Sequence, residues 1–273
     1  KALGTYNATT ENYLTGSGGA ICMDRGTLTV NANTTLSDNE AQGSSTYVFS
    51  SCGGAVYLDN ATMTMNGGTL SGNKAAGTGG ETHGGGVYVN GNTFTMVNGS
   101  ITGSIANGNG GGVYVTGGTF TMQGGSMTGN RAQKADDSDA REMNGGAVYV
   151  GNVGTPTFDM QGGTISGSSA DGKGSAVYLG NAESRMTMSG GSITGNNVDG
   201  DTGAVEVGNV DARITFSGAP TVYDNVYEGQ QKNVVLSAED RDIIHTTGAG
   251  LTQNAHVGVY VTGNGTPGSE TEP

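Results

Sequence analysis

Residues 111–130 read Gly-Gly-Val-Tyr-Val-Thr-Gly-Gly-Thr-Phe-Thr-Met-Gln-Gly-Gly-Ser-Met-Thr-Gly-Asn, and this stretch decides the fold. Versions of Gly-Gly-Ala-Val-Tyr-Val occur seven times, each followed by versions of Phe-Thr-Met and of Gly-Gly-Ser-Ile-Thr-Gly-Asn. The first inward apolar residues of the seven copies are Ile21, Val56, Val87, Val113, Val148, Val177 and Val205. A fixed order of three short strand-like segments, repeated along a chain, is typical of the coils of a β-solenoid. The sequence therefore predicts an all-β protein with one elongated body.

The length of the repeat varies mainly at one corner. The step from the first strand to the second is 7 residues in the first four copies and 9 or 10 in the later ones. The step from the second strand to the third is 7 or 8 residues, whereas the return to the next first strand takes between 12 and 21. The shortest coil is therefore 26 residues long. Insertions at the return corner are expected to project from one face of the stack.

Two-residue alternation separates the interior side chains from the exterior ones. In the second copy, Val56, Leu58, Met63, Met65 and Leu70 are expected to point inward. Stacked over the coils, such positions form columns of apolar side chains, each worth about 1.5–3 kcal/mol when fully buried. Successive coils are expected about 4.8 Å apart, the spacing of paired strands.

The pattern weakens after the seventh copy but does not stop. Val234-Val235-Leu236, Ile243-Ile244 and Leu251 suit the three strands of an eighth coil. Val257, Val259 and Val261 alternate and are expected to close the stack as a last strand. We therefore expect about eight coils with three strands each.

The two ends of the chain lack the repeat. Residues 1–262 are assigned to the solenoid, within which residues 1–17 form an N-terminal cap that hides open strand edges. Residues 263–273 are rich in Gly, Thr, Ser, Glu and Pro and are assigned to a C-terminal linker. Because the chain begins at Lys1, we expect it to be a monomeric domain of a larger, multidomain protein.

Composition excludes several classes of partner. The formal net charge is −13, with only 11 Lys and Arg residues, which argues against binding nucleic acid or an anionic membrane surface. No run of about 18 apolar residues is present, so no membrane insertion is expected. The two cysteines, Cys22 and Cys52, leave a disulfide open, because they pair only if the residues between them fold back.

The repeat resembles that of a known group of proteins. Gly-Gly-Ala-Val-Tyr-Val, Phe-Thr-Met-x-Gly-Gly and Ser-Ile-Thr-Gly-Asn resemble right-handed parallel β-helix repeats in large surface proteins of gut and oral bacteria. They are also similar to the Gly-Gly-Ala-Ile and Phe-x-x-Asn repeats of chlamydial polymorphic outer-membrane proteins. The resemblance implies a right-handed, single-stranded parallel β-helix of the pectate-lyase-like fold. It also implies an adhesin-like role at the cell surface or in the secreted fraction, and it carries over no catalytic residue.

Five outward tyrosines occupy the same slot of consecutive coils: Tyr57, Tyr88, Tyr114, Tyr149 and Tyr178. One interpretation is a stacked ladder that stiffens the sheet through cross-strand aromatic pairs. The other is an aromatic platform that binds sugars or a partner protein. The sequence leaves both open.

The three longest returns, residues 37–53, 72–84 and 129–144, carry much of the charge. As insertions at one corner of neighbouring coils, they are expected to form one binding patch for a host or bacterial surface glycan or protein. The candidate ligand-binding residues at this corner are Tyr47, His83, Arg131 and Arg141. The five tyrosines of the strand slot are further candidates.

The third insertion also holds a candidate metal site. Asp136, Asp137 and Asp139 supply oxygen ligands of the kind that Ca²⁺ prefers, although their spacing is not that of an EF-hand. Apart from Ca²⁺, no cofactor is expected.

Ice binding and carbohydrate cleavage are two alternative functions. Outward hydroxyl pairs such as Ser100 and Thr102 recur on the third strand, as on ice-binding solenoids, but Ser replaces Thr at half of these positions. A polysaccharide lyase or glycoside hydrolase needs paired carboxylates, whereas Asp159 and Glu206 are expected on different faces. We therefore expect a non-catalytic, extracellular bacterial surface domain, adhesin-like or stalk-forming, with a carbohydrate-active enzyme as the alternative.

Overall fold

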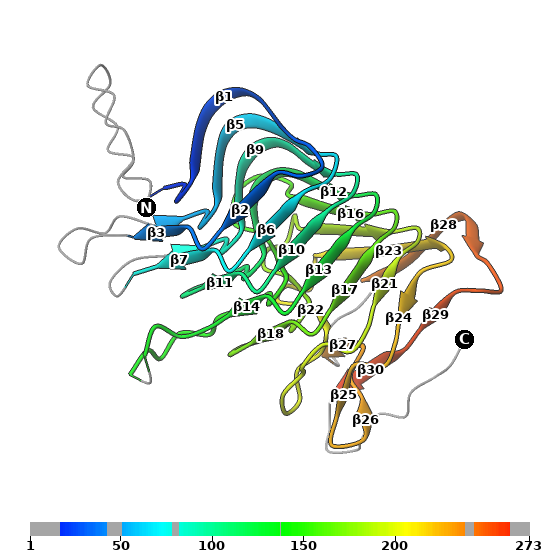
Figure 1. Cartoon of the computed structure of the whole chain (residues 1–273). Coiled ribbons are helices and arrows are strands. Elements are labelled where there is room, and N and C mark those ends of the chain that lie inside the picture. The colour runs from blue at the N-terminus through cyan, green and yellow to red at the C-terminus, as the bar shows by residue number, and fades with distance from the viewer. Residues whose placement is uncertain (1–16, 43–50, 78–81, 137, 238–242, 263–273) are drawn as a thin grey trace.

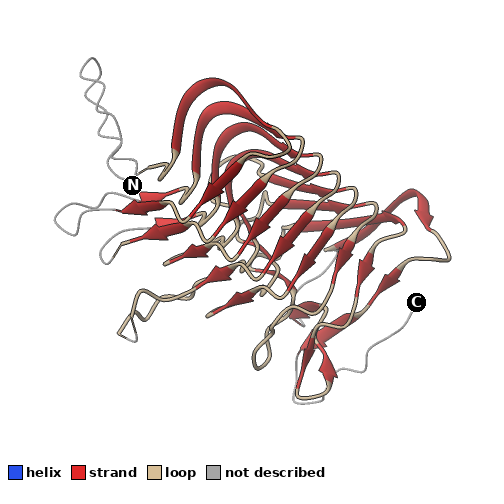
Figure 2. Ribbon diagram, viewed as in Figure 1, coloured by secondary structure: helices blue, strands red, loops and turns tan. Residues whose placement is uncertain are grey.

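A computed structural model describes residues 17–42, 51–77, 82–136, 138–237 and 243–262. Within these ranges all regular elements are strands, and the coils stack on one another as a parallel β-solenoid (Figure 1; Figure 2). The eight stacked strands of the second sheet are separated by about seven turns of the chain, close to the eight coils predicted. No helix in the described part of the chain is long and apolar enough to span a membrane.

The largest sheet, sheet A, contains the predicted first and second strands of every coil. Its strands are β1 (Ile21–Val30), β5 (Val56–Met65), β9 (Val87–Met96), β12 (Val113–Met122), β15 (Val148–Val150), β16 (Thr157–Met160), β19 (Val177–Leu179), β20 (Arg185–Met188), β22 (Val205–Val207), β23 (Arg213–Gly218), β27 (Val234–Ser237), β28 (Ile244–Leu251) and β30 (Val259–Thr262). Neighbouring strands pair in parallel, with equivalent residues of successive coils opposite one another.

The length of the first step decides whether the first two strands remain separate. Where the step is 7 residues, they join into one bent strand of ten residues, as in β1, β5, β9 and β12. The bend uses left-handed residues such as Asn60, whose φ is 49°, and three of these strands arch over the top of the molecule in Figure 1. Where the step is 9 or 10, the extra residues form a turn, and β12 pairs with both β15 and β16.

The predicted third strands form sheet B. Its strands are β2 (Thr35–Ser37), β6 (Thr69–Ser71), β10 (Ser100–Thr102), β13 (Ser126–Thr128), β17 (Thr164–Ser166), β21 (Ser192–Ile193), β24 (Thr221–Val222) and β29 (His256–Val257). In each of the first five strands a buried or half-buried apolar residue lies between two outward hydroxyls, as the alternation predicts.

A further sheet, sheet C, was not predicted. Its strands lie at the start of the segments that return from the third strand of one coil to the first strand of the next. Its strands are β3 (Glu40–Gln42), β7 (Lys74–Ala76), β11 (Ile105–Ala106), β14 (Arg131–Ala132) and β18 (Ser169–Ala170). Two small pairs accompany the loops: β4 (Ser51–Cys52) with β8 (Thr82–His83), and β25 (Val226–Tyr227) with β26 (Gln230–Gln231).

The interior consists of stacked apolar columns. The inward residues predicted for the second copy are all fully buried: Val56, Leu58, Met63, Met65 and Leu70. Within one column the ring centroids of Phe94 and Phe120 are 4.8 Å apart, and those of Phe120 and Phe158 are 5.1 Å apart. Offset aromatic pairs at such distances add to the free energy gained by burial.

Buried asparagines join the coils at the corner between sheets B and C. The side chain of Asn130 accepts the N–H of Ser104 at 3.0 Å and donates to the carbonyl of Ile101 at 3.0 Å, both in the preceding coil. Asn196 makes the equivalent bonds to Ser168 and Ile165. These amides satisfy backbone groups that would otherwise be buried without partners.

The last coil corrects one detail of the sequence prediction. Leu251 is not a third strand, because it ends β28 in sheet A and remains 36% exposed. Val257 takes the third-strand position in sheet B, and Val259 begins β30, which pairs with β27. The single last strand expected from Val257 to Val261 is therefore two strands, because the chain turns at Gly258, whose N–H bonds to sheet B.

The ends predicted from composition fall mainly outside the described residues. Of the predicted cap, only Ser17 is described, and the predicted linker at 263–273 is not. At the start of the stack, Ile21, Met23 and Leu28 point toward the interior but are only half-buried.

Candidate functional site

The tyrosine slot on the outer face of sheet A runs through the whole stack. Opposite one another in successive coils are Cys22, Tyr57, Tyr88, Tyr114, Tyr149, Tyr178, Glu206, Val235 and Tyr260. The repeated tyrosines of this column end at Tyr178, and Glu206 follows them. The structure extends the column by Val235 and Tyr260, so that Glu206 is an acidic residue within it.

The first four tyrosine rings stack face to face. Successive ring centroids lie 5.1, 5.1 and 4.8 Å apart, with interplanar angles of 14° or less. Tyr114 is only 3% exposed, and the ring of His83 also stacks on it at 4.3 Å. A platform for sugars needs free ring faces, whereas each of these rings stacks on at least one other ring. The geometry favours the ladder for these four residues, and ligand binding by them stays a prediction.

Tyr178 differs from the other rings of the stack. Its ring is tilted by 34° from that of Tyr149, with centroids 5.6 Å apart. A Cβ placed on Gly208 would lie 2.1 Å from the Tyr178 hydroxyl oxygen, and one on Gly180 would lie 2.1 Å from that of Tyr149. A larger residue at either position would force the tyrosine ring to shift, because each tyrosine lies over the backbone of the next coil. Burial raises the pKa of Tyr178 far above its usual range.

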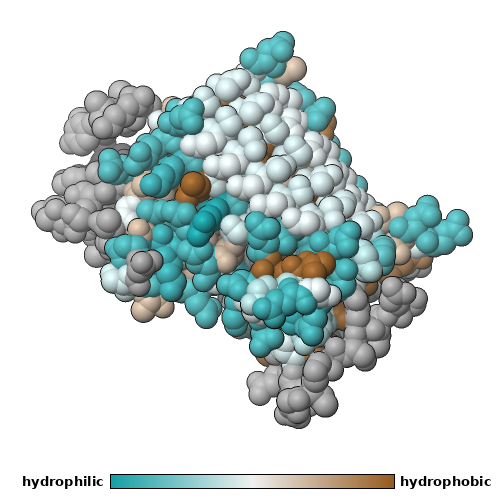
Figure 3. Space-filling view, turned by 60° about the horizontal axis from the view of Figure 1, so that its bottom comes forward, coloured by the Kyte–Doolittle hydropathy of each residue, from teal (hydrophilic) through white to brown (hydrophobic). Residues whose placement is uncertain are grey.

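Each of the three insertions contains one strand of sheet C near its start. β3, β7 and β14 belong to one sheet, so these strands of the three insertions lie on the same side of the solenoid (Figure 1). Seen from this side, the surface has a pale face of intermediate hydropathy and a largely hydrophilic region beside it (Figure 3). The predicted common corner therefore exists for the described parts of the insertions.

Both arginines predicted at this corner contact carboxylates. Arg131 Nη2 lies 2.9 Å from Asp171 Oδ1, and Arg141 Nη2 lies 2.7 Å from Asp139 Oδ2. His83 is buried, and its Nδ1 accepts the N–H of Asn109 at 3.0 Å, so the ring supports the corner from inside. Tyr47 lies outside the described residues.

The predicted Ca²⁺ ligands are engaged within their own loop. Asp136 accepts the N–H of Ser138 at 2.9 Å, and the Arg141 guanidinium lowers the pKa of Asp139 to about 2. Asp137 lies outside the described residues. Among the described His, Cys, Asp and Glu residues, no group of three or more is arranged to hold a metal ion. The Ca²⁺ site stays a prediction.

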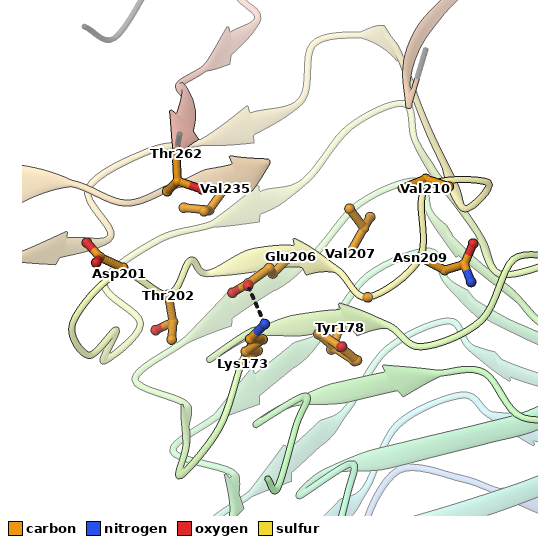
Figure 4. A pocket seen from close by; sticks show the side chains of 11 residues that line it. Lys173, Tyr178, Asp201, Thr202, Glu206, Val207, Asn209, Val210, Val235 and Thr262 are labelled. Atoms are coloured by element: carbon orange, nitrogen blue, oxygen red, sulfur yellow. Dashed lines mark ion pairs between the residues drawn. The ribbon is translucent and has the colours of Figure 1, made fainter. Parts of the chain in front are cut away.

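A hollow of about 490 Å³ opens where the tyrosine stack ends, and we call it the Glu206 hollow (Figure 4). It is lined by Lys173, Tyr178, Asp201, Thr202, Glu206, Val207, Gly208, Asn209, Val210, Val235 and Thr262. These residues come from successive coils, with Glu206 on β22 at the centre. Lys173 and Asp201 lie on short returns at the same corner as the insertions.

Glu206 is held in a mostly buried position. It is 8% exposed, its Oε2 accepts the N–H of Gly203 at 3.1 Å, and its Oε1 lies 3.9 Å from Lys173 Nζ. Burial raises the pKa of this carboxyl, and the Glu142 carboxylate on the third insertion adds to the rise. A buried carboxyl with a raised pKa beside a hollow is typical of a functional site.

The third insertion also supports Lys173 directly. Asn144, near the end of that insertion, accepts the Lys173 N–H on its Oδ1 at 2.6 Å. Lys232, which is not among the residues that line the hollow, is 2% exposed, with its Nζ 3.9 Å from the centre of the Tyr260 ring and 3.5 Å from Asp201 Oδ1. Sequence reasoning missed these lysines, although Glu206 in a tyrosine slot was a visible signal.

The outward hydroxyl groups form rows in register on both sheet A and sheet B. In sheet B, Thr35, Thr69, Ser100, Ser126, Thr164, Ser192 and Thr221 form one column. The second half of sheet A carries Thr-x-Thr in four consecutive coils, at Thr27/Thr29, Thr62/Thr64, Thr93/Thr95 and Thr119/Thr121. Ice binding stays a prediction, which thermal hysteresis measurements check.

Neither of the two cysteines forms a disulfide. Cys22 is exposed at the start of the tyrosine slot in sheet A, and Cys52 is buried in β4, opposite His83. The disulfide left open by the sequence is not formed.

Comparison with protein-family models, with curated proteins and with solved structures finds no match to this chain.

Proposed function

We propose that this chain is a non-catalytic, adhesin-like domain of an extracellular bacterial surface protein, and that it binds a surface glycan or protein at the insertion corner. The observation that carries the proposal is the common origin of the insertions. β3, β7 and β14 are strands of one sheet, so three insertions of different length each place a strand on the same side of the stack. Variable loops on a fixed scaffold are the usual place of binding residues.

The rest of the described surface supports a scaffold role. The outer face of sheet A carries stacked tyrosines and rows of threonines, and that of sheet B carries rows of hydroxyl groups in register. Repeats with such constant faces use one face or one corner for recognition. The acidic charge of the chain favours partners other than nucleic acid.

Deleting residues 133–142 tests the proposal. This segment follows β14 and ends before Met143, which is buried and supports the next return. We expect the variant to keep its unfolding transition and to lose binding to a panel of bacterial and host glycans and surface proteins. A deletion variant that binds every ligand of the parent chain would refute a role for this insertion.

A carbohydrate-active enzyme is the second candidate, favoured by one observation. Glu206 has a raised pKa beside a hollow, as a general acid requires. Glycoside hydrolysis also needs a second carboxylate about 5–10 Å away. Asp201 is the other carboxylate that lines this hollow. Release of new reducing ends from a polysaccharide panel, abolished by Glu206→Gln, would support the enzyme and contradict the non-catalytic domain.

A further inference from the structure

We propose that the Glu206 hollow binds a neutral pyranose sugar and rejects uronic and sialic acids. This inference rests on the proposed function, because it assigns a class of ligand to the same corner of the solenoid. Four features of the hollow carry it: a break in the tyrosine column, an apolar wall, polar groups at the centre and edge, and an excess of negative charge.

Glu206 interrupts the tyrosine column with a carboxyl that accepts the N–H of Gly203 and lies near Lys173. Tyr57, Tyr88, Tyr114, Tyr149 and Tyr178 precede the break, and Val235 and Tyr260 follow it. Glu206 places a carboxyl between them at 8% exposure, where an aromatic ring would extend the stack. A buried charged group is costly, and a position that breaks the local rule of a repeat is where a function is expected.

The hollow has the size and the apolar wall of a small-ligand site. Its volume of about 490 Å³ lies within the range of about 300–1,000 Å³ that is usual for ligand pockets. Val207 and Val235 are nearly buried in its wall, and Val210 at the rim is 49% exposed. A pyranose ring has a face of C–H groups that packs against such side chains.

The polar groups match the hydroxyls of a sugar. Glu206 and Asp201 offer carboxylate oxygens that accept hydrogen bonds, and Lys173 offers an ammonium that donates them. Asn209 supplies an amide on the opposite side from Asp201 (Figure 4). Adjacent sugar hydroxyls both donate and accept, so acceptors and donors on different walls can engage one ring. Hydrogen bonds to charged groups are the stronger kind.

The charges of the hollow disfavour an anionic ligand. Glu206 and Asp201 line the hollow, and the Glu142 carboxylate is close enough to raise the pKa of Glu206. Of the residues that line the hollow, only Lys173 carries an ammonium group, whereas Lys232 lies outside this lining and is 3.5 Å from Asp201 Oδ1. A uronic or sialic acid would add a further carboxylate to this excess, which disfavours binding.

The test measures binding of methyl glycosides to the full chain by saturation-transfer NMR and calorimetry. The probes are the methyl glycosides of glucose, galactose and N-acetylglucosamine, with methyl galacturonide as the anionic comparison. We expect at least one neutral glycoside to bind and the galacturonide to bind at least about tenfold more weakly. Equal or tighter binding of the galacturonide overturns the inference, as does failure of all the neutral glycosides to bind.

Variants locate the site. Glu206→Gln keeps the shape of the side chain, and Lys173→Met alters a half-exposed side chain, so neither requires the core to repack. Each is expected to weaken binding of the neutral glycoside about tenfold or more, with an unchanged unfolding transition. Glu183→Gln is the matched control at an exposed glutamate outside the hollow, and it should bind as the parent does.

The outcomes separate this inference from the proposed function. If glycan or protein binding is lost on deleting residues 133–142 but kept by both hollow variants, the insertion corner binds and the sugar site is refuted. If both hollow variants lose the neutral glycoside while the deletion keeps its binding, the sugar site stands and the role of the insertion is refuted.

Discussion

The hydroxyl of Tyr178 occupies the space that a side chain at Gly208 would fill, since a Cβ there would lie 2.1 Å from the tyrosine oxygen. The ring of one coil therefore lies over bare backbone of the next. This contact sets the position of Tyr178, and with it one side of the Glu206 hollow.

Replacing Gly208 with alanine tests this contact. We expect Gly208→Ala to lower the free energy of unfolding by about 1–3 kcal/mol, because the added methyl group forces Tyr178 from its position. Denaturant unfolding followed by circular dichroism measures the loss. Adding Tyr178→Phe should recover part of it, since the hydroxyl is the nearest atom. Gly117→Ala is the control, because the nearest atoms to its Cβ are 3.6 Å away; an equal loss there would contradict the explanation.

Asn130→Ala tests the asparagine bonds between coils. The substitution leaves the N–H of Ser104 and the carbonyl of Ile101 buried without their partner. We expect a loss of about 2–3 kcal/mol in the free energy of unfolding, measured in denaturant. Asn98→Ala, at an exposed turn, is expected to change stability by no more than about 0.5 kcal/mol. Similar losses at both positions would show that the interior location of Asn130 has no special effect.

The stability of the protein should depend on pH through Glu206. Burial raises the pKa of this carboxyl above 4.5, the value of an unperturbed glutamate. The folded state then holds its proton at a pH where the unfolded state has lost it, so stability falls as the pH rises from 4.5 through the folded-state pKa.

Glu206→Gln cannot ionise and should lack this fall. The free energies of unfolding of parent and variant, measured between about pH 4 and pH 7, are expected to shift in favour of the variant as the pH rises. Glu183→Gln, at an exposed site, should follow the parent. A difference that grows in favour of the parent would reverse the sign and contradict the buried position of Glu206.

Thiol titration tests the state of the two cysteines. With an aromatic disulfide reagent, the native protein should show one slowly reacting thiol, that of Cys22, because burial and then the Asp59 and Asp24 carboxylates raise its pKa. Cys52 is 3% exposed and should react only after unfolding. Cys22→Ser should abolish the native reaction, whereas an unfolded, unreduced protein without reactive thiols would prove a disulfide.

The sequence predicted the interior of the solenoid because two-residue alternation reports burial directly. Val56, Met63 and Leu70 mark the three segments of one coil, and all are fully buried. The joining of the first two strands was not predicted, although the 7-residue step encodes it. Such a step leaves only a bend at Asn60 between the inward residues of β5.

Sheet C and the Glu206 hollow were beyond the sequence for different reasons. Strands such as β14 have two residues, which is too short for an alternation pattern. The hollow brings together Lys173, Asp201 and Glu206 from returns and a strand whose separations carry no motif. The sequence showed only that Glu206 replaces tyrosine in the column. That this carboxyl is buried beside a hollow follows from the structure alone.

The tyrosine stack also gives the protein a built-in optical reporter. The chain has no tryptophan among its 273 residues, so its near-ultraviolet signal comes mainly from 11 tyrosines. Rings about 5 Å apart and nearly parallel, such as Tyr88 and Tyr114, have coupled electronic transitions, which isolated tyrosines lack. A split tyrosine band in circular dichroism would therefore report the alignment of successive coils, and its decay on heating would show when the stack separates.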